Sequence, residues 1–162
     1  MTETQGRSGA PGCPGTEELA ILHQWHGLQT GVQRLTDSLF ASVEAENGLA
    51  PSSFQALMFL MTAPDQAAPM NQLAQALGFS TAGTTKVVDR LADAGLVERR
   101  PSCSDRRVTY TALTSAGSET VLAASRSLAR VVRDRVVEPL GAERFAELTE
   151  AIRSLDPAPE EC

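Results

Sequence analysis

Aromatic residues are scarce in this sequence, at 4% of 162 residues, although hydrophobic residues as a whole make up 42%. A core with so few aromatic rings has to be filled with Leu, Val and Ala, as packed helices do. No apolar run approaches the roughly 18 residues that a membrane span requires. Residues 1–15 are rich in Gly, Pro and Ser and lack the apolar stretch of a signal peptide. We therefore expect a cytoplasmic, mainly α-helical protein with no membrane partner.

Metal ligands and catalytic motifs are equally scarce. The three cysteines, Cys13, Cys103 and Cys162, form no CxxC or Cys/His pattern, and only two histidines could assist them. The sequence also lacks a nucleophile elbow, a phosphate-binding loop and a paired-carboxylate arrangement. We expect no cofactor, no metal site and no enzymatic activity.

Negative charge dominates the chain, whose net charge is −6, but it is unevenly spread. Residues 80–112 carry six basic and four acidic groups, whereas the segments before and after them are net negative. Contact with a polyanion depends on the charge of the docking face rather than on that of the whole chain. The net-positive segment is therefore the candidate for contact with nucleic acid.

The segments outside this region have the patterns of long helices and tails. From Thr16, an N-cap followed by two acidic residues, apolar residues recur every three or four positions up to Asn47. Another long helix is expected from Thr114 to about Val137, where Pro139 breaks it, and a short helix follows. The predicted segments are a disordered leader (residues 1–15), an N-terminal helix (16–50), a central domain (51–113), C-terminal helices (114–156) and a tail (157–162).

Short elements alternate within the central domain. A helix stopped by Gly78 is followed by a tight turn, a second helix ending at Gly95, and two strands rich in β-branched residues. The two helices are expected at residues 70–77 and 82–94, and the two strands at residues 96–100 and 108–113. A loop at residues 63–69 is expected to precede them. This order of elements is a winged helix-turn-helix, so the predicted fold is mainly α with a small β-hairpin.

The second helix of this unit buries one face and offers short polar and basic groups on the other. Hydroxyls and cations near a helix N-terminus can approach phosphates and base edges in the major groove, and arginines on a hairpin suit the minor groove. The candidate DNA-binding residues are Ser80, Thr81, Thr84, Thr85, Lys86, Arg90, Arg99, Arg106 and Arg107. Two simpler interpretations remain open. Arg99 and Arg100 would be a solvated strand end, and Arg90 would pair with Asp93 or Asp89.

Two stretches of this region resemble a known family. Leu91–Gly117 (LADAGLVERRPSCSDRRVTYTALTSAG) is similar to the wing of the multiple antibiotic resistance regulator (MarR) family. Phe79–Leu91 (FSTAGTTKVVDRL) resembles that family's recognition helix. Asp105 and Arg107 match the Asp-x-Arg pair of the wing tip, where Asp105 would hold the hairpin or orient an arginine. The Leu-Thr-x-x-Gly exit pattern is met at Leu113, Thr114 and Gly117.

The resemblance extends over roughly residues 17–155 and implies a homodimer whose first and last helices interlock as dimerisation helices. It also implies that small anionic or aromatic ligands bind between these helices and the DNA-reading lobe and weaken DNA binding. Trp25, His26 and Met58 are the candidate ligand-binding residues. The simpler interpretation makes His26 a buried histidine bonded to backbone, and Met58 a core or dimer-packing residue.

The expected function follows from the motif and the resemblance. The chain is predicted to be a sequence-specific DNA-binding transcriptional regulator, a repressor relieved by a small ligand, which binds a pseudo-palindromic operator on double-stranded DNA as a homodimer. The alternative is a winged-helix module that binds protein and not DNA. That alternative requires an exposed apolar patch between Ser80 and Arg90.

Overall fold

The computed structural model describes residues 14–101 and 108–155, and the chain divides between Asp37 and Ser38 into two units. The described part of the first unit is helical from Thr16 and belongs to α1 (Thr16–Asn47). Its large apolar side chains are exposed, at Leu19, Ile21, Leu22, Trp25, Leu28, Val32 and Leu35. None of the helices in the described residues has the length and apolar character needed to cross a membrane.

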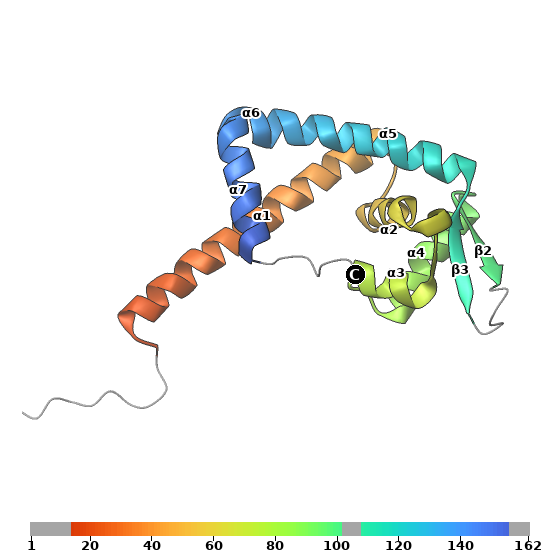
Figure 1. Ribbon diagram of the computed structural model, residues 1–162, viewed down its shortest axis with the longest axis horizontal. Coiled ribbons are helices and arrows are strands. Elements are labelled where there is room, and N and C mark those ends of the chain that lie inside the picture. Colours follow the sequence, from red (N-terminus) through yellow and green to blue (C-terminus); the bar gives the residue numbers. More distant parts are fainter. Residues whose placement is uncertain (1–13, 102–107, 156–162) are drawn as a thin grey trace, which may run out of the picture. The chain divides into compact units, whose positions relative to one another are not determined.

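The second unit contains the end of α1 and all later elements (Figure 1). In chain order these are α2 (Pro51–Thr62), a 3-10 turn (Pro64–Gln66), β1 (Ala67–Pro69), α3 (Met70–Leu77), α4 (Thr81–Asp93), β2 (Val97–Pro101), β3 (Thr109–Leu113), α5 (Ser115–Val132), a π-helical turn (Arg133–Val137), α6 (Glu138–Leu140) and α7 (Ala142–Leu155).

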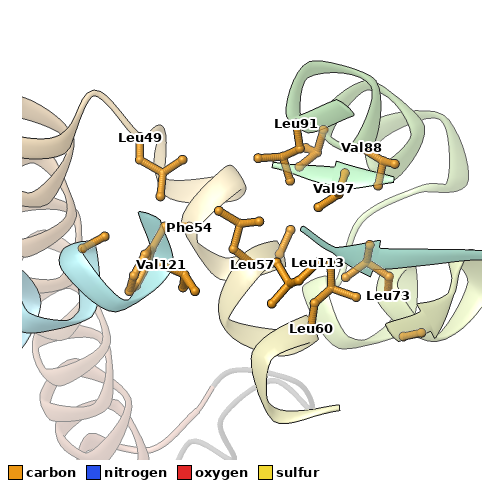
Figure 2. Close-up of a cluster of buried hydrophobic side chains, with 14 of the residues drawn as sticks. Leu49, Phe54, Leu57, Leu60, Leu73, Val88, Leu91, Val97, Leu113 and Val121 are labelled. Atoms are coloured by element: carbon orange, nitrogen blue, oxygen red, sulfur yellow. The ribbon is translucent and has the colours of Figure 1, made fainter. Parts of the chain in front are cut away.

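Helix α2 lies at the centre of the core of this unit. Its buried residues Ser53, Ala56, Leu57 and Leu60 follow the i, i+3, i+4, i+7 spacing of one helix face. This helix packs against α3, α4, α5 and β3. Figure 2 shows Leu57 and Leu60 among apolar side chains from these neighbours. Full burial of one such leucine contributes about 1.5–3 kcal/mol, so the core fixes how α4 and the sheet are placed around α2.

The sheet has three antiparallel strands in the order β1-β3-β2, and the predicted hairpin forms its β2–β3 part. Val97 lies opposite Leu113 in that hairpin, and Ala67 lies opposite Ala112 in the β1–β3 pair. The sequence prediction of a loop over residues 63–69 is therefore wrong for β1. A strand of three residues is too short to show an alternation of apolar and polar residues in the sequence. Strand β1 forms because it pairs with β3. The predicted fold class is confirmed, with one strand more than expected.

The helical path after α5 continues through Pro139 and ends at Gly141, which has a φ of 84°. The prediction that Pro139 breaks the helix is wrong. Proline lacks the N–H that an α-helix would use at this position, and the π-helical turn Arg133–Val137 comes directly before α6. Such wide turns absorb local irregularity without ending a helix. Gly141 ends it instead, because a positive φ suits glycine.

An ion pair connects the last turns of α1 to α5. Nη2 of Arg130 donates to the two carboxylate oxygens of Glu46 at 2.7 and 2.6 Å. Hydrogen bonds to Arg130 and then to Ser127, together with the attraction of the guanidinium charge, lower the pKa of Glu46 below its ordinary value of 4.5. The hydrogen bond with Glu46 raises the pKa of Arg130 in turn.

The lowered pKa of Glu46 predicts a pH-dependent contribution to stability. A carboxyl group whose folded pKa lies below its unfolded pKa stabilises the fold above the unfolded value, and the contribution disappears as the pH falls through the folded value. Glu46→Gln should therefore unfold at a lower urea concentration than wild type near pH 7, and the difference should vanish in acid below pH 4.5. Glu44→Gln, at an exposed residue of the same helix, is the control. A Glu46→Gln deficit that stays constant from neutral to acid pH would contradict the role of this ion pair.

Candidate nucleic-acid interface

Helix α4 begins with a capped turn that follows α3 directly. Gly78 ends α3 with a φ of 66°, in the left-handed region where glycine is favoured. The side chain of Ser80 then accepts a hydrogen bond from the backbone N–H of Gly83 at 3.2 Å, which is the geometry of an N-cap. The apolar face of α4 is buried through Val87, Val88 and Leu91, so the opposite face has to point outward.

The outward face of α4 is polar and basic. Thr81, Lys86 and Arg90 are exposed, and Thr85 is partly buried with its hydroxyl donating to the carbonyl oxygen of Thr81 at 2.9 Å. No large apolar side chain between residues 80 and 90 is exposed. Within the described residues, neither Lys86 nor Arg90 forms an ion pair. Their charges are therefore available to a polyanion in this part of the molecule.

Thr84 lies on the wrong side of α4 to contact DNA. Its relative exposure is 0%, and its hydroxyl donates to the carbonyl oxygen of Ser80 at 3.1 Å. Thr84 precedes Val87, Val88 and Leu91 by three, four and seven residues, so it shares their buried face. The prediction that Thr84 contacts DNA is wrong, and the residue belongs to the core.

A hollow of about 360 Å³ lies next to the start of α4. It is lined by the end of β1, the start of α3, the start of α4 and the start of β3 with the residue before it, namely Pro69, Met70, Asn71, Thr81, Val108 and Thr109. The side chain of Asn71 is exposed at the N-terminal end of α3. Asn71 was not among the predicted DNA-binding residues, although a polar side chain at a helix start is a usual phosphate neighbour.

The arginines of the first wing strand are engaged with carboxylates. Nη2 of Arg99 lies 2.5 Å from Oδ1 of Asp89 on α4, and Arg100 pairs with Glu98 of its own strand. Arg99 was predicted to contact DNA, and the simpler interpretation made both arginines a solvated strand end. The structure shows Asp89 as the partner of Arg99, whereas the sequence suggested only a pairing of Asp89 with Arg90. The tight turn between α4 and β2 brings the last turns of the helix beside the strand, and this turn is the signal that could have indicated the pair.

Three predicted wing residues, Asp105, Arg106 and Arg107, lie outside the described residues. The exit from the wing is described, and it is a junction of backbone contacts. Thr114 caps α5 by accepting from the N–H of Gly117 at 3.0 Å, and its hydroxyl donates to the carbonyl oxygen of Gly95 at 2.8 Å. Its own N–H donates to the carbonyl oxygen of Leu96 at 3.1 Å. This junction ties the turn after α4 to the start of α5.

The candidate ligand-binding residues fall in different units. Met58 lines a hollow of about 370 Å³ between α2 and α3, together with Phe54, Gln55, Phe59, Ala76 and Leu77. The sulfur of Met58 also accepts a hydrogen bond from the hydroxyl of Ser125 on α5 at 3.0 Å. Trp25 and His26 belong to the first unit and are exposed, so His26 is not the buried histidine of the simpler interpretation. Within residues 14–101 and 108–155, no three potential metal ligands come together.

Comparison with known proteins agrees with this geometry. The model of the MarR family matches residues 47–108. The transcriptional repressor MprA of Escherichia coli K12 is 35% identical over 72 residues, which are 44% of this chain and 41% of that protein. The matched region thus spans less than half the length of this curated relative.

Solved structures match over most of the chain. Sco3205 of Streptomyces coelicolor, a MarR family transcriptional regulator solved in complex with DNA, has a TM-score of 0.74 and 24% identity, with 94% of this chain and 95% of that chain covered. The transcriptional repressor CouR, solved on a 23-mer DNA duplex, has a TM-score of 0.69 and 27% identity, with coverages of 79% and 91%.

Two helices joined by a tight turn and followed by an antiparallel sheet define a winged helix-turn-helix protein. The core residues of α4, namely Val87, Val88 and Leu91, fall within the residues 47–108 that the family model matches. Over residues 47–108 this chain therefore resembles the MarR family, and its fold is that of the solved MarR family structures.

Proposed function

We propose that this protein regulates transcription by inserting α4 into the major groove of an operator. The observation that carries the proposal is the polar, basic outer face of α4 from Ser80 to Arg90, set on a helix whose other face is anchored in the core. A protein-binding winged helix would need an apolar patch there, and no large apolar side chain is exposed in that range. The DNA complexes of Sco3205 and CouR support the same placement by similarity.

The operator-bound form in this proposal is a homodimer. The exposed apolar residues of α1 recur at helical spacing from Leu19 to Leu35, and α7 presents a second such row at Leu148, Ile152 and Leu155. Apolar rows of this length are costly in water and are usually covered by a partner. A second copy covers both rows and places its own α4 about one helical turn of DNA, roughly 34 Å, from the first.

The regulation in this proposal is repression that a small aromatic or anionic ligand relieves. The hollow beside Met58 adjoins α3, which braces α4, so a ligand held there can alter the position of the recognition helix. The name of MprA as a repressor supports repression over activation. Trp25 and His26 of the first unit remain proposed ligand contacts.

The proposal is tested by the mass and ligand response of the complex with DNA. The full chain is mixed with duplexes from the region upstream of its own gene, and light scattering after gel filtration gives the stoichiometry. Two chains of 17.2 kDa per duplex are expected, and some member of a panel of phenolic and other aromatic acids should release the DNA. A free protein of monomer mass that binds DNA as one copy would refute the dimer. A complex that no ligand in the panel weakens would remove the support for relieved repression.

A further inference from the structure

The ion pair between Asp89 and Arg99 joins the recognition helix to the wing. Oδ1 of Asp89 on α4 and Nη2 of Arg99 on β2 are 2.5 Å apart, across ten residues of sequence. Among the residues that the structure describes, no other side-chain hydrogen bond connects α4 with β2. The pair therefore connects the recognition helix of the proposed function with the first strand of the hairpin, whose arginines were predicted to suit the minor groove.

Strand β2 has few other contacts that could fix its position relative to α4. It is an edge strand, hydrogen-bonded on one side to β3. Only its first residue, Val97, is buried, and Glu98 to Pro101 are exposed. Beyond Val97 the strand is held by its pairing with β3 and is not buried against α4, so the contact of Arg99 links the outer half of β2 to that helix.

The charges of this pair also argue against a direct role in phosphate contact. A free carboxylate on the recognition helix would repel the phosphates, and Asp89 is neutralised because Arg99 pairs with it. Arg99 in turn has its guanidinium engaged with that carboxylate, whereas no described residue pairs with Lys86 or Arg90. The arginine thus differs from the cations on the outer face of α4.

We propose that Asp89 is a positioning residue, which holds the wing strand against the recognition helix through Arg99. Arg99 then contributes to DNA binding through this pair and not as a phosphate contact. The inference rests on the proposed DNA-binding function and assigns a separate task within it. A fixed spacing between α4 and β2 lets the helix and the wing reach neighbouring grooves together.

The test measures the affinity of the full dimeric protein for a bound duplex by fluorescence anisotropy at several salt concentrations. Asp89→Asn and Arg99→Gln are each expected to weaken binding about 5–10-fold, and the double variant no more than either alone. The slope of log K against log salt should stay at the wild-type value, because no phosphate contact is lost. Exchange of the two charges, with Asp89→Arg and Arg99→Asp together, should recover most of the affinity. Asp93→Asn is the matched control on the same helix and should not weaken binding.

Three results would overturn the inference. Tighter binding by Asp89→Asn would mean that the carboxylate only repels DNA. A fall of about 0.9 in the salt slope for Arg99→Gln, with Asp89→Asn like wild type, would make Arg99 a direct phosphate contact. If Asp93→Asn and Asp89→Asn lose the same amount of DNA affinity, Asp89 is not a positioning residue. Failure of the wild-type protein to bind any duplex is a distinct outcome, which refutes the proposed function and this inference with it.

Discussion

Gly117→Ala is expected to destabilise the protein by about 3 kcal/mol, near the upper end of overpacking effects. A Cβ atom at this position would lie 1.9 Å from the carbonyl oxygen of Leu96 and 2.9 Å from its carbonyl carbon. Backbone atoms cannot swing aside as a flexible side chain can, so the start of α5 has to move away from the turn after α4. The same movement would strain the hydrogen bonds of Thr114 to Gly95 and Leu96.

The thermal midpoint of Gly117→Ala should fall by about 10 °C, as measured by circular dichroism. Gly83→Ala is a matched control, because Gly83 occupies the equivalent place in the first turn of α4 and likewise donates its N–H to a capping hydroxyl. An added Cβ there meets only Oγ of Ser80 at 3.4 Å and Cβ of Phe79 at 3.7 Å, which are ordinary contacts. Equal midpoints for the two variants would contradict the tight junction.

Lys86→Glu is expected to weaken operator binding by about 100-fold, with little change in the thermal midpoint. Lys86 is exposed on the outer face of α4, and no described residue pairs with it. The substitution replaces attraction to phosphates by repulsion, and in the proposed dimer it does so twice. The dissociation constant from anisotropy measures the loss.

Arg126→Glu controls for the change in total charge in this comparison. Arg126 is exposed on α5, outside the proposed interface, and the substitution alters the net charge by the same amount. Its affinity should remain within a few-fold of wild type. If the two variants lose affinity equally, the effect comes from the overall charge, and α4 has no special contact with DNA.

Local sequence signals were sufficient for most of the central fold. The predicted helix over residues 70–77 coincides with α3, because Gly78 marks its end in both sequence and structure. The β2–β3 hairpin was likewise visible from its β-branched residues and turn. Strand β1 was not, since its formation depends on β3 more than 40 residues later along the chain. The prediction of a helix break at Pro139 was wrong because a π-helical turn precedes this proline, and no sequence pattern indicated that turn.

The candidate site was predictable where it depends on one helix and was missed where it depends on packing. Thr84 has the spacing of the buried residues of α4. Its position in the helix therefore predicted its burial better than its polar hydroxyl predicted exposure. The pairing of Asp89 with Arg99 requires β2 to lie beside α4, which is a tertiary contact. The closeness of Gly117 to Leu96 is also tertiary, although the exit pattern had drawn attention to that glycine.

An equilibrium competition between duplexes tests whether the outer face of α4 reads double-stranded DNA. The protein is bound to a labelled duplex from its own upstream region and is challenged with a shuffled duplex and with heparin over a range of moderate salt concentrations. We predict a preference of about 1,000-fold or more for the upstream duplex over the shuffled one. Equal affinity for the two duplexes and for heparin at every salt concentration would show that α4 does not read DNA sequence.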